Sequence, residues 1–360
     1  MKDCCPSPAI LFLSNIHVMN TFSRRHFIKT SLLAIAATGA GLPKSQQKAM
    51  TVRGWLPARK LGAVLPHEHV LVDFSGAASI DTSRYDLDEI FRAVLPHLQA
   101  AKKAGCNTLI ECTPDYLGRS PVLLRRLSEA TGLHILTNTG YYGAVGHKYL
   151  PAHVQTESPR QLADRWLREW QHGIGDSGIR PGFMKISVDE APLTDLQQKI
   201  VEAAAIAHLE SGLTIASHTI GGAAAMQELD ILKKNAVAPD AFIWIHAQSE
   251  QDTRYHLEAA RAGSWVEFDG LNANYLGPDT VQQHLDFLML MKKEKLLHRT
   301  LLSQDAGWYA IGEPEGGKFA PFTYLFDSFV PLLSKHGFSR KDLDLILRTN
   351  PQKAFAVAVR

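Results

Sequence analysis

Side chains that can bind metal ions occur at the ends of strand-like runs spread along most of the chain. They are His67, His69, Lys185, His218, His246 and Asp305. Imidazole nitrogens and carboxylate oxygens are ordinary ligands of zinc, iron, cobalt and manganese, and a lysine is the unusual member of such a set. Two divalent ions held close together can generate hydroxide from a bridging water and polarise a carbonyl or phosphoryl oxygen. The set therefore predicts a binuclear metal-dependent hydrolase, with zinc as the first expectation for the metal.

The first two ligands occur in the sequence His67-Glu68-His69, which ends a strand-like run. Because side chains alternate between the two faces of a strand, both histidines point to one face and Glu68 points to the other. Two imidazoles in this arrangement can bind one ion. An isolated pair of this kind is more often found at a surface, but the apolar residues Val64 and Leu65 before it and the other ligands favour a metal site.

Lys185 lies in the apolar run 183–186, where a buried ammonium ion would be costly. Burial and nearby cations favour the neutral amine, which can take up carbon dioxide to form a carbamate with two oxygen ligands for two metals. The alternative is a lysine that reaches solvent from the end of a strand. Alone, His218 and His246 would be interpreted as core histidines and Asp305 as a helix N-cap. Only the complete set favours ligation.

Ligands so far apart in sequence can meet only where many strand ends converge. Short runs rich in Val, Ile, Leu and Thr alternate with helical patterns, and the expected strands are 63–71, 108–112, 134–139, 183–188, 213–218, 242–246, 264–268 and 300–304. Helical spacing occurs between them, for example in 87–104, 158–171, 195–211 and 280–293. A doubly wound open sheet would explain the alternation but would not bring these strand ends to one site. We therefore predict an α/β fold, a single-domain (β/α)8 TIM barrel over residues 51–360.

Residues 1–50 are expected to be a leader and not part of the barrel. Residues 23–29, SRRHFIK, are typical of a twin-arginine export signal, and the apolar run that follows is too short to span a bilayer. The alternative is an ordinary secretory signal or a basic helix that is not cleaved. The prediction implies the twin-arginine translocase as a partner, a periplasmic or otherwise exported protein, and no stable membrane insertion.

The charge distribution agrees with this division. The whole chain has a net charge of +2, but residues 1–50 hold six basic residues against one acidic residue, so the remainder is slightly acidic. No basic patch remains to neutralise nucleic-acid phosphates, which argues against a nucleic-acid partner. Cys106 and Cys112 lie in or beside one apolar run, and we expect both to be buried free thiols.

With these residues in view, the chain from about 52 to 357 resembles the phosphotriesterase family of the amidohydrolase superfamily. The matching stretches are Leu61-Gly62 before His67-Glu68-His69, Thr139-Gly140-Tyr141-Tyr142, Gly182-Phe183-Met184-Lys185-Ile186 with Asp189-Glu190, the histidines 218 and 246, Asp305, and Thr349-Asn350-Pro351. The resemblance implies two divalent ions. The counterparts of His67, His69, Lys185 and Asp305 hold the more buried one, and the carbamylated lysine bridges to a second ion held by the counterparts of His218 and His246. Asp305 would also accept a proton from the bridging hydroxide, and relatives are commonly dimers.

Substrate indications come from residues near the expected strand ends. Tyr142 matches a pocket tyrosine of the phosphotriesterase-like lactonases, which favours hydrolysis of a lactone or carboxylic ester. Asp269 is followed by Gly270, where those lactonases typically have an arginine, and this difference argues against an acyl-homoserine lactone as the substrate. The segment 306–321 is expected to be a long loop that covers the site and contacts substrate through Trp308. The alternatives are an organophosphate phosphotriesterase (aryldialkylphosphatase) and a non-catalytic metal-bound binding protein.

Overall fold

A computed structural model of the protein describes residues 47–360, and the predicted twin-arginine motif lies outside these residues. The first described elements are the strands β1 (Lys48–Thr51) and β2 (Gly54–Pro57), which form an antiparallel hairpin. Ala49 on β1 is fully buried in a hydrophobic cluster with Phe183 and Phe355. The folded body therefore includes residues 48–50, which were expected to belong to the leader. Export and dimer formation stay predictions.

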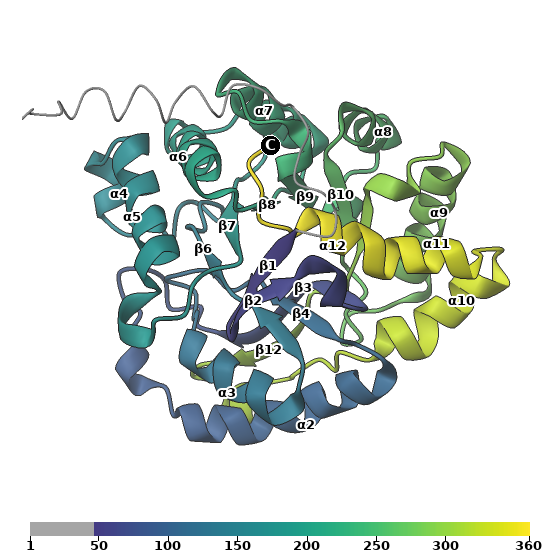
Figure 1. Cartoon of the computed structure of the whole chain (residues 1–360), viewed down its shortest axis with the longest axis horizontal. Helices are drawn as coiled ribbons and strands as arrows, with labels where there is room; N and C mark the ends of the chain where they lie inside the picture. The colour runs from purple at the N-terminus through teal and green to yellow at the C-terminus, as the bar shows by residue number, and fades with distance from the viewer. Residues whose placement is uncertain (1–46) are drawn as a thin grey trace, which may run out of the picture. The chain divides into compact units, whose positions relative to one another are not determined.

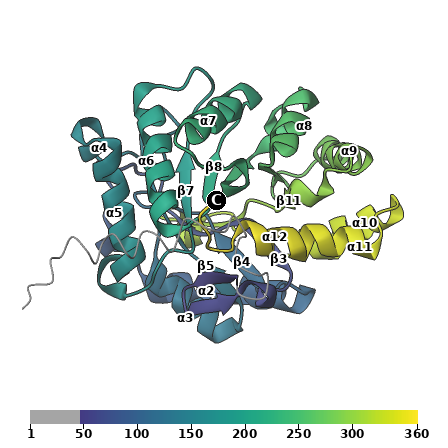
Figure 2. The same ribbon diagram turned by 45° about the horizontal axis from the view of Figure 1, so that its top comes forward.

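A ring of parallel strands follows the hairpin, and helices surround it (Figures 1 and 2). The strands are β3 (Val64–Val72), β4 (Thr108–Glu111), β5 (His134–Leu136), β6 (Asn138–Thr139), β7 (Phe183–Ser187), β8 (Ile215–His218), β9 (Phe242–Ile245), β10 (Trp265–Phe268), β11 (Thr300–Leu302) and β12 (Ala306–Ala310). They pair in the orders β12-β3-β4-β5 and β6-β7-β8-β9-β10-β11, with every pair parallel. The chain has a TIM-barrel-like α/β fold.

The helices connect successive strands on the outside of the ring. They are α2 (Leu87–Ala104), α3 (Pro121–Thr131), α4 (His153–Thr156), α5 (Pro159–His172), α6 (Asp195–Ser211), α7 (Gly222–Lys234), α8 (Thr253–Ala262), α9 (Pro278–Lys293), α10 (Val330–Lys335), α11 (Arg340–Asp344) and α12 (Asn350–Ala354). Within residues 47–360, none of them is long and apolar enough to cross a membrane. Cys106 and Cys112 are buried free thiols, as expected.

Two of the expected strands are interrupted. The third, 134–139, is divided into β5 and β6 at Thr137, whose carbonyl accepts a hydrogen bond from Gly182 N at 2.7 Å. In the eighth, 300–304, only residues 300–302 form a strand, β11, which pairs with β10. The chain then continues into β12, which pairs with β3. The prediction of a loop over the whole of 306–321 was therefore wrong, because its first residues complete the sheet.

The hairpin and the C-terminal segment cover the amino end of the ring. Val357 N donates to Lys48 O at 2.9 Å, and Ala358 N donates to Gly212 O at 2.9 Å. The carboxyl ends of the strands are therefore left for a site, as in other barrels of this kind.

Glu68 holds the first and last strands together. Its side chain is fully buried and accepts hydrogen bonds from Ala306 N (2.8 Å), Ser303 Oγ (2.8 Å) and Gln304 N (3.2 Å). Burial raises its pKa to about 8, although these donors oppose the shift. Glu68 thus points away from its neighbouring histidines and into the joint where the ring closes.

We expect Glu68→Ala to lower the free energy of unfolding of the metal-free protein by about 3 kcal/mol, because it leaves buried donors without an acceptor. Glu68→Gln retains one oxygen and should lose less. The measurement is the urea midpoint of each variant, and an unchanged midpoint for Glu68→Ala would show that closure does not depend on the Glu68 carboxyl group.

Candidate metal centre

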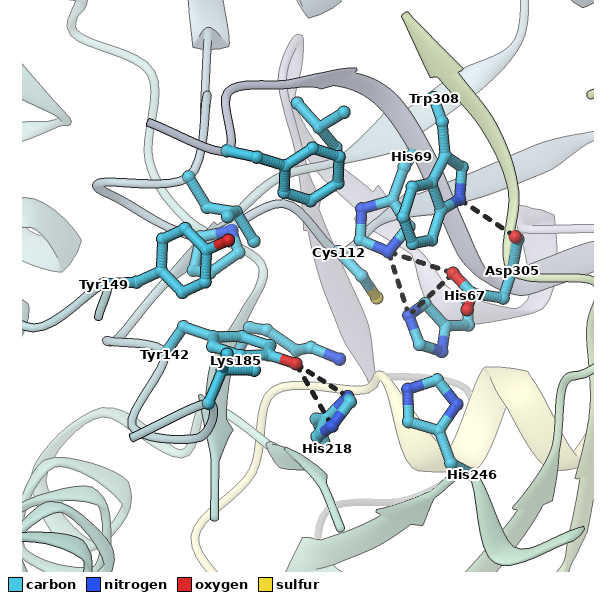
Figure 3. A pocket seen from close by; sticks show the side chains of 15 residues that line it. His67, His69, Cys112, Tyr142, Tyr149, Lys185, His218, His246, Asp305 and Trp308 are labelled. Atoms are coloured by element: carbon cyan, nitrogen blue, oxygen red, sulfur yellow. Dashed lines mark hydrogen bonds and ion pairs between the residues drawn. The ribbon is translucent and has the colours of Figure 1, made fainter. Parts of the chain in front are cut away.

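All the predicted ligand side chains line one cavity of about 130 Å³ at the carboxyl ends of the strands (Figure 3). They lie on or directly after four strands, and in the joint between β11 and β12. These residues are His67 and His69 on β3, Lys185 on β7, His218 on β8, His246 after β9, and Asp305. The predicted substrate contacts, Tyr142 and Trp308, line the same cavity. The structure thus brings together every residue that the sequence proposed for the site.

His67 and His69 point toward each other across the end of β3. Their Nε2 atoms are 3.2 Å apart, and Asp305 Oδ1 lies 3.2 Å from His69 Nε2 and 3.7 Å from His67 Nε2. Asp305 Oδ1 is buried and makes no hydrogen bond within residues 47–360. A carboxylate oxygen and two imidazole nitrogens that converge in this way fit a cation.

The other nitrogen of each imidazole is already occupied. His67 Nδ1 lies 2.9 Å from Asp269 Oδ2, His246 Nδ1 lies 2.7 Å from Asp269 Oδ1, and His69 Nδ1 lies 2.8 Å from Thr113 Oγ1. A proton on Nδ1 that is donated to such an acceptor leaves a lone pair on Nε2. Two lone pairs that face each other 3.2 Å apart are unfavourable unless a cation lies between them, so the donor set fits a metal ion.

The electrostatics keep these ligands in the protonation states that metals require. Burial, followed by the charge of Lys185, lowers the pKa of His67 to about 3, and burial also lowers the pKa values of His69 and His218. Burial opposes ionisation of Asp305, but His67 and His69 outweigh it and lower the carboxyl pKa to about 2. Neutral imidazoles and an ionised carboxylate are the forms that coordinate a metal.

Two ligands have unusual backbone conformations. His246 and Asp305 adopt left-handed conformations, with φ of 64° and 52°. Such conformations cost about 1 to 3 kcal/mol in residues other than glycine and are concentrated at functional sites. Here they turn the side chains that follow β9 and β11 into the cavity.

Lys185 is 1% exposed and lies on the inner face of β7. Its amine makes no hydrogen bond or ion pair within the described part of the chain, which is unusual for a buried lysine. The backbone beside it is tightly packed, because a Cβ at Gly140 would lie 2.2 Å from Lys185 O. Figure 3 shows its amine directed toward the histidines, where it can reach a bound group.

His218 and His246 form the other side of the cavity, with ring centroids 4.4 Å apart. The Tyr142 hydroxyl lies 3.1 Å from both ring nitrogens of His218, and burial raises the tyrosine pKa. The nitrogen and oxygen ligand atoms of His67, His246 and Asp305 lie within 4.8 Å of one another. The two groups of ligands therefore face the same space.

Sequence reasoning missed residues that position the ligands. Asp269 was noted only for the residue that follows it, yet it is fully buried and contacts both His67 and His246. Its pKa is held well below the ordinary value because the attraction of these histidines outweighs burial. A carboxylate directly after a barrel strand was a usable signal. Thr113 gave no signal of its own.

We expect Asp269→Asn to weaken metal binding by about 10- to 100-fold, because an amide cannot accept from both imidazoles. Competition with a chelator would measure the dissociation constant. Asp252→Asn is a matched control, since Asp252 lies outside the metal cavity, where it caps α8 and pairs with Arg254, and a neutral Asn can also cap a helix. Equal metal affinity in the two variants would contradict an orienting role for Asp269.

A parallel barrel with histidines and a carboxylate converging at its strand ends is the architecture of a metal-dependent hydrolase. The chain belongs to the phosphotriesterase family, whose sequence model matches residues 47–355. This family depends on divalent metals, and the residue groups described above can bind them. The protein is a phosphotriesterase-family hydrolase.

Individual relatives of the chain carry different names. The chain is 28% identical to the phosphotriesterase homology protein of Escherichia coli, over 82% of this chain and 98% of that protein. It is 25% identical to the N-acetyltaurine hydrolase of Danio rerio, over 85% of this chain and 97% of that protein. The structure of the organophosphorus hydrolase from Deinococcus radiodurans superposes with a TM-score of 0.79 at 28% identity, covering 89% of this chain and all of that one.

Proposed function

We propose that the protein is a binuclear metal-dependent hydrolase that cleaves a lactone or another carboxylic ester. The observation that carries this proposal is the convergence of all the predicted ligands on one small cavity. His67, His69 and Asp305 would hold the more buried ion, and His218 and His246 the second. Lys185, carbamylated, would bridge them, since its amine has no other partner among residues 47–360.

The residues of the chain then have distinct tasks. Divalent ions bound there would supply an activated water and polarise the oxygen of the group under attack. Asp305 would accept the proton of that water and carry it toward the leaving group. Its side chain is 22% exposed and can reach the open part of the cavity, whereas the His67 side chain is only 1% exposed. The Tyr142 hydroxyl, adjacent to His218, would orient the substrate oxygen.

The size of the cavity supports a carboxylic substrate. A cavity of about 150 Å³ holds one benzene molecule, and this one has about 130 Å³, which the ions would share with the reacting group. A carbonyl group is planar and has two substituents, whereas a phosphotriester has three substituents around a tetrahedral phosphorus. The second candidate function is phosphotriester hydrolysis, which the likeness to an organophosphorus hydrolase favours.

The test is an assay of the metal-reconstituted protein against γ- and δ-lactones, aryl esters and dialkyl aryl phosphates. We expect turnover of at least one lactone or ester with a kcat/KM about tenfold or more above that for every triester. Triesters turned over far better than all lactones and esters would reverse this order.

A further inference from the structure

A second, wider cavity of about 530 Å³ adjoins the metal cavity. Phe74 and Trp308 line both cavities, and their ring centroids are 5.7 Å apart. These two rings therefore form the wall between the inner cavity, which contains the metal ligands, and the outer cavity.

Trp308 is held firmly in this wall (Figure 3). Its indole Nε1 donates to Asp305 O at 2.9 Å, and its ring packs edge-on against His69 with centroids 5.2 Å apart. The backbone is also fixed, since Trp308 has a φ of 76° and a Cβ at Gly307 would lie 1.8 Å from His69 O. The ring cannot move aside without breaking the contacts that hold Asp305 and His69.

The two cavities differ in the chemistry of their walls. Besides the metal ligands, the inner cavity is mainly lined by apolar or aromatic side chains, among them Val72, Leu117, Tyr142, Val145 and Tyr149. The outer cavity instead includes the charged residues Asp73, Arg84, Glu313 and Lys318. A molecule that occupies both would have a small apolar end and a larger polar end.

We propose that Trp308 and Phe74 separate the two ends of the bound substrate. A short apolar acyl group would lie in the inner cavity and a larger polar leaving group in the outer one. This inference rests on the proposed function and names its substrate class: short-chain acyl esters of polar alcohols. The inner cavity of about 130 Å³ must also hold the ions and the attacking water, so only a short acyl group fits there.

The orientation of the ester in the two cavities follows from where the proton of the attacking water must go. Hydrolysis forms a bond from the water oxygen to the acyl carbon and breaks the bond to the leaving oxygen, which must take up a proton. Asp305 is the group positioned to deliver this proton. Its backbone carbonyl accepts hydrogen bonds from Trp308 Nε1 and from Asn272 Nδ2 (2.7 Å). Asn272 lies in the β10–α9 loop, as does Tyr275, which lines the outer cavity. The leaving oxygen therefore lies near Asp305 in the inner cavity, and the group attached to it would extend past Trp308 into the outer cavity.

The kinetic test uses 4-nitrophenyl esters of acetate, butyrate, hexanoate and octanoate with the metal-loaded protein. We expect kcat/KM to fall about tenfold or more from butyrate to octanoate, and the octanoate-to-acetate ratio to rise about tenfold in Trp308→Ala. Phe74→Ala should raise the ratio in the same direction, and as Phe74 is 41% exposed this variant is expected to fold. Trp55→Ala is the matched control, because Trp55 lies on β2 outside both cavities and is 48% exposed.

A binding measurement separates this inference from the proposed function. Acetohydroxamate and octanohydroxamate bind metal through the same head group and differ only in the tail. Calorimetry with the metal-loaded protein should show about tenfold tighter binding of the shorter compound, and Trp308→Ala should abolish the difference. The same preference without cleavage of any ester would overturn the hydrolase proposal but support the division of the site. Equal binding of the two hydroxamates, or a preference that Trp308→Ala and Phe74→Ala leave unchanged, would overturn the division itself.

Discussion

Lys185→Ala is expected to lose bound metal and hydrolytic activity together, with metal affinity reduced by about 100-fold or more. The reason is that a carbamylated Lys185 would contribute one oxygen to each of two ions, so its removal weakens both sites. The amine has no hydrogen bond or ion pair in the described structure that would give it another task. Metal content by elemental analysis and kcat/KM on the best ester are the two measurements.

A pair of variants separates ligation from packing. Lys185→Met fills most of the buried space without an amine, so it should lose metal as Lys185→Ala does while unfolding at a midpoint closer to the wild type. Formate or acetate should partly restore activity in Lys185→Ala, where space for a carboxylate remains, and not in Lys185→Met. Two ions retained at wild-type affinity in both variants would rule out the bridge.

The order and the inner faces of the strands were predictable because they depend on local patterns. The His-x-His pair had to place both imidazoles on one face of β3, and the histidines that close apolar runs had to lie at the carboxyl ends of β8 and β9. Parallel βα repeats then bring these strand ends together regardless of the sequence and conformation of the loops. The ligands could therefore be predicted from the sequence as a set.

The remaining features depend on contacts between distant residues. Asp269 is hydrogen-bonded to both His67 and His246, and Glu68 accepts hydrogen bonds from residues more than 200 positions later in the chain. Neither partner is indicated by local spacing. The strand β12 was missed for the same reason, because its sequence, AGWYA, contains a glycine and lacks apolar alternation, and it is a strand only because β3 lies beside it.

Asp305→Asn is expected to lower kcat by about 100- to 10,000-fold, the range for removing a general acid or base, while metal affinity falls much less. The amide oxygen can still face His67 and His69, but an amide cannot accept the proton of the attacking water. The wild-type carboxylate is ionised and so can accept a proton, because its contacts with the histidines outweigh the effect of burial and lower its pKa to about 2.

This variant also decides between an enzyme and a binding protein. Loss of turnover with both ions still bound would mean that Asp305 moves a proton in a reaction, which a binding protein does not require. Asp305→Ala is the useful companion, because it removes the ligand as well and should lose metal and activity together. Asp305→Asn with nearly wild-type kcat would assign the proton transfer to another group. A wild-type protein that holds two ions and cleaves nothing in the substrate panel would instead favour the binding protein.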